Sequence, residues 1–145
     1  MANLTCKVLL TESPLEAPPM QGDSATGAVA DFWGVVRGSE DGREIQGIDY
    51  EAHRQMAEHQ LRQIGIQATA EFGLNGVIIH HRIGFIAVGE PSLFVRVCSP
   101  HRQAAFRAIR WIVDELKKKA PIWKRPRLKI ARRGEPRSAP AATVK

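Results

Sequence analysis

The chain has 145 residues, 43% of them hydrophobic and 25% charged, which is the composition of an ordinary globular protein. This length allows one hydrophobic core, so we expect a single domain over residues 1–130 and a basic tail over 131–145. No segment has the character of a transmembrane span or a signal peptide, and Cys6 and Cys98 lack zinc-binding spacing. We therefore expect a cytoplasmic protein with no metal and no cofactor.

Positive charge is concentrated near the C-terminal end. Residues 1–116 hold 10 Lys/Arg against 14 Asp/Glu, whereas residues 117–145 hold 11 Lys/Arg against Glu135 alone. The net charge of +6 therefore comes from the last part of the chain. We expect an anionic partner or substrate to meet the protein there.

The first half of the chain predicts three strands and a helix. Apolar alternation favours strands at 5–12, 27–38 and 45–52, and the Pro-rich stretch 13–26 is a connection with room for a helical turn. The turn-rich sequence "GSEDGRE" predicts a hairpin between the second and third of these strands. Residues 54–73 carry apolar side chains at helical spacing: Ala57, Leu61, Ile64, Ala68 and Phe72.

The second half predicts a second hairpin and a second helix. Strands are expected at 75–84 and 91–99, joined by a connection that contains Gly and Pro. A helix is expected from about 100 to 119, with Ser99 as N-cap, Pro100 at the first position and Pro121 as the stop. Its apolar stripe is Ala105, Ile109, Ile112 and Leu116.

This order of elements predicts an α+β fold with a mostly antiparallel sheet and two long helices. Residues 131–145 are expected to form a flexible tail.

Basic residues open the second predicted helix. His101 and Arg102 lie in its first turn, where free backbone N–H groups and the helix dipole favour an anion over a cation. A bound phosphate would explain the pair, and simple exposure at a helix end is the alternative. Arg37, directly after the strand at 27–38, is weak evidence when taken alone.

A run of three lysines closes the same helix. Their charges complement the exposed carbonyls of the last helical turn, and this interaction is enough to explain one or two of the three lysines. Successive helical side chains point about 100° apart, so only one lysine can face the segment after the turn. Pro121 ends the helix there, so that the chain can double back after it.

The remaining candidate residues favour structural roles. Cys98 precedes a helix N-terminus, where a thiol pKa can fall, but no base is evident beside it, which favours a buried structural cysteine. Four of the histidines show no metal-ligand spacing, and a structural role is favoured for each: His53, His59, His80 and His81.

Three segments carry a family pattern: "GAVADFWGVVRG", "HRIGFIAVGE" and "VRVCSPHRQAAFRAIRWIVDELKKKAPIWKR". They combine a strand-end arginine, a His-Arg pair that opens the last helix, and Lys-x6-Lys around Ala-Pro-x-Trp. Together, over roughly residues 27–125, they resemble the large, catalytic subunit of molybdopterin synthase. The resemblance implies the α/β-hammerhead fold of that subunit.

The resemblance also implies a sulfurtransferase of molybdenum cofactor biosynthesis. Such an enzyme transfers two sulfur atoms to cyclic pyranopterin monophosphate and so forms the dithiolene of molybdopterin. The sulfur arrives as a thiocarboxylate on the C-terminal Gly-Gly of a small ubiquitin-like subunit. The assembly is a heterotetramer, in which a homodimer of large subunits carries one small partner at each outer end.

Specific roles follow from the resemblance for residues at the matching positions. Lys117 and Lys124 are implied to be catalytic, and no metal or organic cofactor is implied. With these roles, we predict that Lys117 and Lys124 face one cavity from the two sides of the Pro121 turn, with Trp123 as an apolar anchor. Lys118 and Lys119 are then the solvated part of the run. The implied substrate-binding residues are Val35, Val36, Arg37, His101, Arg102, Lys117, Lys124, Arg125 and Pro126.

Helix geometry adds an argument about the oligomer. His101 and Lys117 are 16 residues apart on one predicted helix, which separates their backbones by about 24 Å. A pterin monophosphate is much shorter, so a site with both residues needs two copies of the chain related by a two-fold axis.

Two other functions stay open at this point. A non-catalytic homologue that binds the small subunit would account for Pro126, where the family usually has an acidic residue, and for a tail without the usual Gly and Trp. A nucleic-acid-binding module would account for the basic tail. Only Trp123 interleaves with that tail, however, and the sequence offers no stacking platform. A membrane partner is not expected.

Overall fold

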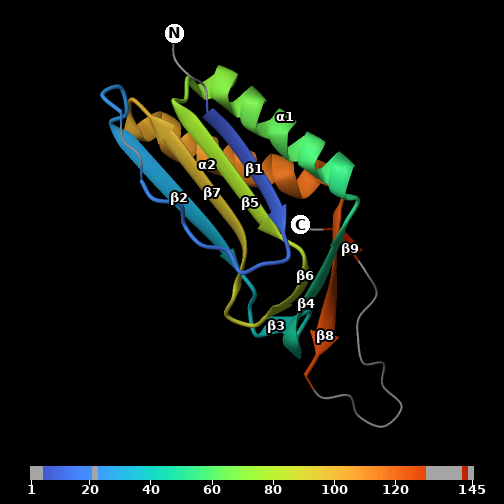
Figure 1. The fold of residues 1–145 in the computed structure, drawn as a ribbon. Coiled ribbons are helices and arrows are strands. Elements are labelled where there is room, and N and C mark those ends of the chain that lie inside the picture. Colours follow the sequence, from blue (N-terminus) through green and yellow to red (C-terminus); the bar gives the residue numbers. More distant parts are fainter. Residues whose placement is uncertain (1–4, 21–22, 130–141, 144–145) are drawn as a thin grey trace.

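The computed structural model of the protein describes residues 5–20, 23–129 and 142–143 (Figure 1). The first elements in chain order are β1 (Thr5–Thr11), β2 (Ala28–Val35), β3 (Ser39–Glu40), β4 (Arg43–Ala52) and helix α1 (Arg54–Phe72). They are followed by β5 (Gly76–Arg82), β6 (Gly84–Ala87), β7 (Pro91–Ser99), helix α2 (Arg102–Lys119), β8 (Ile122–Leu128) and β9 (Ala142–Thr143).

Two sheets form the framework of the fold. The four-stranded sheet has the order β1-β5-β7-β2, in which β1 is parallel to β5 and the other pairs are antiparallel. In the second sheet β4 pairs with β3, β6 and β8, and β8 pairs with β9, all antiparallel. The prediction of an α+β fold with mostly antiparallel pairing and two long helices is confirmed.

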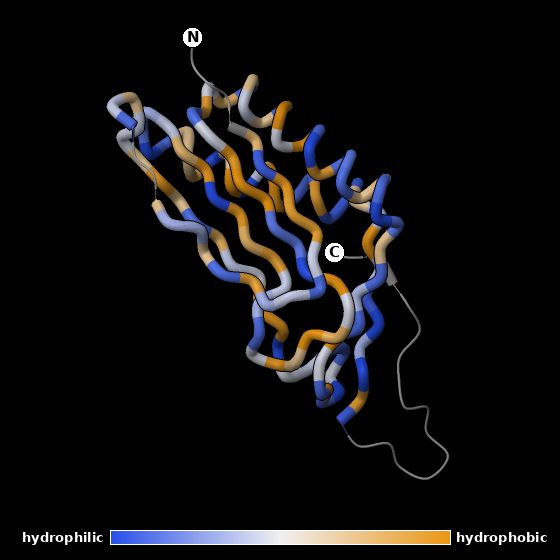
Figure 2. The backbone as a smooth tube through the Cα atoms, in the orientation of Figure 1, coloured by the Kyte–Doolittle hydropathy of each residue, from blue (hydrophilic) through white to orange (hydrophobic). Residues whose placement is uncertain are grey.

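Both helices cover the same face of the four-stranded sheet (Figure 1). Helix α1 packs on β1 and β5, and α2 packs on β2, β7 and α1. The predicted stripe of α1 is buried at Ala57, Leu61, Ile64 and Ala68. Phe72, its last member, is half-buried and packs edge-on against Trp111 of α2, with ring centroids 6.0 Å apart. In Figure 2 hydrophobic colour runs along the central strands, and hydrophobic and hydrophilic residues alternate along α1.

The N-terminal end of α2 differs from the prediction, whereas the C-terminal end agrees with it. The N-cap is His101 rather than Ser99, and its side chain makes no capping hydrogen bond. Ser99 is instead the buried last residue of β7, and its hydroxyl donates to the His101 carbonyl at 2.9 Å. It therefore secures the turn between β7 and α2, and Pro100 precedes the helix. The C-terminal prediction is confirmed, because Ala120 before Pro121 is extended (φ −71°, ψ 127°).

The buried stripe of α2 is slightly different from the predicted one. Ile109 is half-buried, and Ala108 and Val113 join the fully buried set. The buried residues are Ala105, Ala108, Ile112, Val113 and Leu116.

The predicted hairpin between residues 27–38 and 45–52 is wrong. The turn exists at Asp41 and Gly42, both with positive φ (51° and 77°), but it joins the short strand β3 to β4. Strand β2 pairs with β7 instead, and its register shifts between Gly34 and Val35. The chain thus passes from one sheet to the other directly after β2.

Four of the described strands were not predicted: the two-residue strands β3 and β9, and the longer strands β6 and β8. β6 occupies part of the expected connection between β5 and β7 and pairs with β4. β8 follows Pro121 at once and lies along β4. The described residues of the connection 13–26, which are 13–20 and 23–26, contain one hydrogen-bonded turn from Asp23 to Thr26 and no helix.

Most of the predicted flexible tail, 131–145, lies outside the described residues. The exception is Ala142–Thr143, which pairs with Trp123 and Lys124 of β8. Within the part of the chain that the structure describes, neither helix combines the length and apolar character needed to cross a membrane.

Candidate active site

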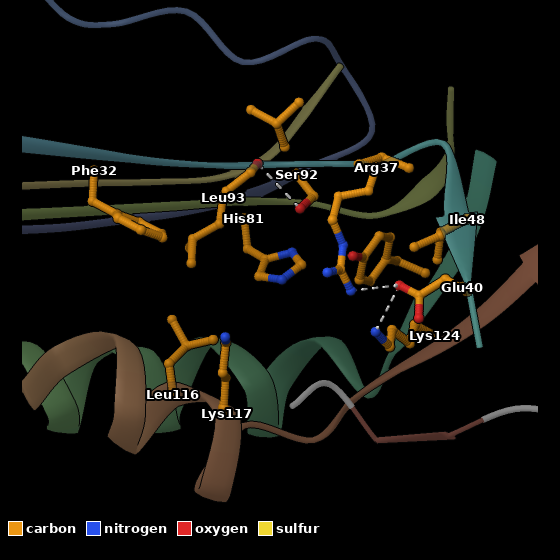
Figure 3. A pocket seen from close by; sticks show the side chains of 14 residues that line it. Phe32, Arg37, Glu40, Ile48, His81, Ser92, Leu93, Leu116, Lys117 and Lys124 are labelled. Carbon is orange, nitrogen blue, oxygen red and sulfur yellow. Dashed lines mark hydrogen bonds and ion pairs between the residues drawn. The ribbon is translucent and has the colours of Figure 1, made fainter. Parts of the chain in front are cut away.

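A pocket of about 280 Å³ lies between the two sheets and the C-terminal end of α2 (Figure 3). Seven helices and strands contribute to it, together with the segment after β2 in which the chain passes from one sheet to the other. Its lining residues are Phe32, Gly34, Val35, Val36, Arg37, Glu40, Ile48, Tyr50, His81, Ser92, Leu93, Leu116, Lys117 and Lys124.

Lys117 reaches the pocket from the last turn of α2. Leu116 before it is completely buried, which fixes the rotation of the helix, and Lys117 is exposed at the pocket mouth. Lys118 and Lys119 are exposed and do not line the pocket, and Lys119 pairs with Glu115 at 3.4 Å. The prediction that only one lysine of the run faces the cavity is confirmed.

Lys124 reaches the pocket from the opposite side of the Pro121 turn. Side chains alternate along β8, so Lys124 lies on the inner side with Ile122 and Pro126, whereas Trp123 and Arg125 face outward. The Lys124 side chain is only 20% exposed. The prediction that Lys117 and Lys124 share one cavity is therefore confirmed. Trp123 is not its apolar anchor, because the strand directs this residue to the other face, where it is 39% exposed.

Glu40 lies between two of the cations. Its carboxylate is 3.2 Å from Nζ of Lys124 and 3.9 Å from Nη2 of Arg37 (Figure 3). The tight turn at Asp41–Gly42 brings this carboxylate to the pocket, where its side chain is 15% exposed. Three cationic side chains and one carboxylate leave the pocket with a formal charge of +2, which favours an anionic ligand.

The floor of the pocket is uncharged at neutral pH. Burial raises the pKa of Tyr50 and lowers the pKa of His81 to about 4. The ring of His81 meets that of Tyr50 edge-on, with centroids 5.4 Å apart. Around them the wall is apolar, formed by Phe32, Ile48, Leu93 and Leu116. The pocket can therefore hold an aromatic group on its floor and anions at its mouth.

The structure brings together only part of the predicted substrate-binding set. Val35, Val36, Arg37, Lys117 and Lys124 line the pocket. His101 and Arg102 are exposed at the other end of α2, about 24 Å from Lys117 of the same chain by helical rise.

Arg125 and Pro126 do not line the pocket of their own chain. Arg125 faces outward because it follows Lys124 in a strand, and Pro126 is buried opposite Ile48 in the register of β4 and β8. Their predicted contact with the substrate therefore finds no support in the geometry of a single chain.

Four polar residues of the pocket were not predicted: Glu40, Tyr50, His81 and Ser92. One of them left a signal in the sequence. His81 continues the inward-facing series of Val77 and Ile79 on β5, so it is a histidine at a core position. Glu40 and Ser92 are brought to the pocket by tertiary contacts, and no local pattern marks them.

The sequence pattern of the family described as MoaE protein matches residues 10–119, which is most of the chain. The chain belongs to the MoaE family. The match includes Arg37, His101, Arg102 and Lys117, and it ends before Lys124.

Relatives and solved structures agree with this membership. The molybdopterin synthase catalytic subunit of Pyrococcus abyssi is 41% identical over 110 residues, which are 76% of this chain and 74% of that protein. The crystal structure of molybdopterin synthase from Staphylococcus aureus has a TM-score of 0.72 at 30% identity and covers 85% of this chain and 90% of its own. A Helicobacter pylori structure, the complex of subunits 1 and 2 of molybdopterin-converting factor, shares the fold. Its TM-score is 0.64 at 20% identity, covering 86% of this chain and 85% of that chain.

These findings confirm the resemblance seen in the sequence, together with the fold it implied. Membership in the MoaE family gives the chain the function of a molybdopterin synthase catalytic subunit, which is an enzyme.

Proposed function

We propose that this chain transfers sulfur from the C-terminal thiocarboxylate of a small ubiquitin-like subunit to cyclic pyranopterin monophosphate, forming the dithiolene of molybdopterin. One observation carries the proposal: Lys117 and Lys124, from the two sides of the Pro121 turn, line one pocket with Arg37. The substrate phosphate and the donor thiocarboxylate are both anions. They can share a pocket only where cations offset their repulsion.

The two lysines have different surroundings and therefore different roles. Lys117 is exposed at the mouth, where the tail of the small subunit would arrive, and it is the main catalytic lysine of the proposal. Its ammonium group stabilises the negative charge that develops on the acyl oxygen and on the leaving sulfur as the acyl–sulfur bond is cleaved. Lys124 is more enclosed and is held by Glu40, so it binds and orients the substrate.

The proposal includes a site shared between two copies of the chain. His101 and Arg102 are exposed and too far from Lys117 to join it within one chain. Phe106, one turn further along α2, is 67% exposed, an apolar side chain that a second copy would cover. In a two-fold dimer the helix start of one protomer approaches the helix end of the other. His101 and Arg102 then complete the phosphate and pterin site of the partner.

The donor is a small subunit with a flexible C-terminal Gly-Gly. Such a tail offers few side-chain contacts, so its recognition relies on backbone hydrogen bonds and on docking of the globular body. The fold likeness to a subunit of the Helicobacter pylori complex supports a partner of this kind. A cytoplasmic location is also part of the proposal, since Cys6 and Cys98 are free thiols and reducing compartments keep thiols in this form.

A reconstitution tests the proposed reaction. The chain is mixed with a thiocarboxylated small subunit and cyclic pyranopterin monophosphate, and the sulfurised product is measured by mass spectrometry. We expect two carriers to be consumed for each dithiolene, and no product from a carrier with an ordinary carboxylate. Tight binding of the carrier without sulfur transfer would instead identify a non-catalytic homologue.

A further inference from the structure

His81 is a buried histidine at the end of β5 that contacts the pocket. Its side chain is 1% exposed, and it lies on the inner face of the strand after Val77 and Ile79. Nδ1 is 2.8 Å from the carbonyl oxygen of Arg82. A carbonyl oxygen can only accept a hydrogen bond, so Nδ1 carries the proton of the neutral ring. Nε2 is then left with its lone pair.

The lone pair of Nε2 has no hydrogen-bond donor among the described residues. The ring lines the pocket, and Figure 3 shows it pointing into the same space as the side chain of Lys117. Burial keeps the pKa of His81 low, at about 4, so the ring is unprotonated at neutral pH. Because the ring lines the pocket, a water or a ligand in the pocket can donate a hydrogen bond to this lone pair.

The proposed reaction requires such a water. When the donor sulfur has bonded to a substrate carbon, the carrier and the substrate are joined as a thioester. Water adds to the acyl carbon, the acyl–sulfur bond breaks with its electron pair leaving on sulfur, and the carrier departs as a carboxylate. One of the two water protons must be taken up as the water adds, and the other goes to solvent.

We propose that Nε2 of His81 accepts the proton of this water and returns it to the sulfur that leaves, so that His81 is a catalytic residue of the transfer. This inference rests on the proposed function. The sulfur remains on the substrate as a thiol, and the imidazole is neutral again at the end of the step. No external oxidant or reductant is needed, because the step is a hydrolysis.

The other polar groups of the pocket cannot serve as this acceptor. Lys117, Lys124 and Arg37 are cationic donors, and Glu40 is held by two of them. The pKa of Tyr50 is raised by burial, so its phenol keeps its proton. The hydroxyl of Ser92 donates to the Gly34 carbonyl. Among the described lining residues, His81 is the one unpaired and unprotonated base.

Three variants separate a catalytic role from a structural one. His81→Asn keeps an N–H group near the position of Nδ1 for the Arg82 carbonyl and removes Nε2. His81→Gln keeps the volume of the side chain, but its amide cannot take up a proton. His80→Asn is the matched control, because His80 points to the opposite face of β5 and does not line the pocket.

In a single turnover with carrier thiocarboxylate and cyclic pyranopterin monophosphate, both His81 variants should release the carrier about 100-fold more slowly than wild type. The thioester between carrier and substrate should accumulate and be visible by mass spectrometry, while carrier affinity stays unchanged. His80→Asn should behave as wild type. In water labelled with heavy oxygen, the released wild-type carrier should gain one labelled oxygen.

Several results would overturn the inference without touching the proposed function. These are carrier release at the wild-type rate in a folded His81→Gln protein, slow release without any accumulated thioester, or wild-type release with no label in the carrier. If wild type makes no sulfurised product at all, the proposed function itself fails.

Discussion

Lys117 occupies the one position of the lysine run from which a side chain enters the pocket. We expect Lys117→Ala to lower the rate of sulfur transfer by about 100-fold or more, the usual effect of removing a charge-stabilising group from an active site. The fold should be retained, because an exposed lysine at a helix end contributes little stability. Single-turnover assays and thermal melting measure the two effects.

Lys118→Ala is the control for this prediction. Lys118 lies in the same helical turn and is also exposed, but it does not line the pocket. Its substitution should change the transfer rate by less than about twofold and the free energy of unfolding by less than about 0.5 kcal/mol. Normal turnover by the Lys117 variant, or equal losses in both, would remove Lys117 from the mechanism.

His81 makes stability depend on pH in a defined direction. Its pKa is about 4 in the folded chain against an ordinary value of 6.5. Between these two pH values the unfolded chain binds a proton that the folded chain excludes. The contribution of His81 to the free energy of unfolding is therefore complete above pH 6.5 and is lost as the pH falls toward 4. We expect a loss of about 3 kcal/mol over this range, measured by urea unfolding.

The control for the pH effect is His81→Asn, whose unfolding free energy should vary less over the same range. Other ionisable groups line the same pocket, namely Arg37, Glu40, Tyr50, Lys117 and Lys124. They are unchanged in the variant, so the difference between the two pH dependences isolates His81. Identical pH dependences would show that the buried ring is protonated as easily in the folded chain as in the unfolded one.

Strand β8 decides which basic residue after Pro121 faces the pocket. Lys124 points inward and Arg125 outward, because consecutive side chains of a strand lie on opposite faces. Lys124→Ala should therefore lose transfer activity by about 100-fold. Moving the ammonium group by one position, in Lys124→Ala/Arg125→Lys, should not restore it.

Arg125→Ala is the complementary variant, because Arg125 is the outward-facing neighbour of Lys124 in β8. With saturating carrier, its transfer rate should equal that of wild type, since the guanidinium lies outside the pocket. A loss comparable to that of Lys124→Ala would show that Arg125 contacts the substrate, as the family resemblance implied.

The sequence predicted the elements whose local pattern is strong. The two helices have apolar residues at helical spacing, and the long strands are rich in Val, Ile and Phe. β8 was missed because "IWKRPRL" shows a basic surface and a proline, and only its register beside β4 makes Ile122 and Leu128 core residues. The β2–β4 hairpin was predicted wrongly because a turn signal does not specify which strands it joins. Here β3, two residues long, forms the pair with β4.

The candidate site was predictable to the extent that neighbouring residues form it. Lys117 and Lys124 are separated by one proline turn, so local rules place one lysine of the run near Lys124, and the family resemblance identified that lysine as Lys117. Glu40, Tyr50 and His81 come from three different strands, and their proximity depends on how the two sheets meet. Arg125 and Pro126 were included because the family resemblance implied them. Neither lines the pocket of its own chain, because Arg125 faces outward in β8 and Pro126 is buried opposite Ile48.

Access of the donor tail to the pocket is a property of the whole assembly. If the C-terminal glycine of the small subunit delivers its sulfur at Lys117, the length of the tail is fixed by where the globular body docks. One extra residue after the terminal glycine would displace the reactive end by about 3.5 Å. We expect such a carrier to bind in competition assays but to transfer no sulfur. Full transfer from the extended carrier would exclude a threaded tail.

The strongest test of the assembly follows from the separation of His101 and Lys117 on α2. Each pocket of the proposed dimer takes its lysines from one protomer and His101 with Arg102 from the other. His101→Ala and Lys117→Ala proteins should each be inactive alone. In a mixed dimer one pocket carries both lesions and the other carries neither.

After equal amounts are mixed and subunits exchange, half of the dimers are mixed and each has one intact pocket. Activity should therefore recover to about a quarter of wild type. Exchange is verified independently with two affinity tags. A chain that remains monomeric at assay concentration, or verified exchange without recovery, would show that His101 does not act in the pocket of a partner. The isolated position of His101 and Arg102 at the far end of α2 would then have to be explained by a separate anion site.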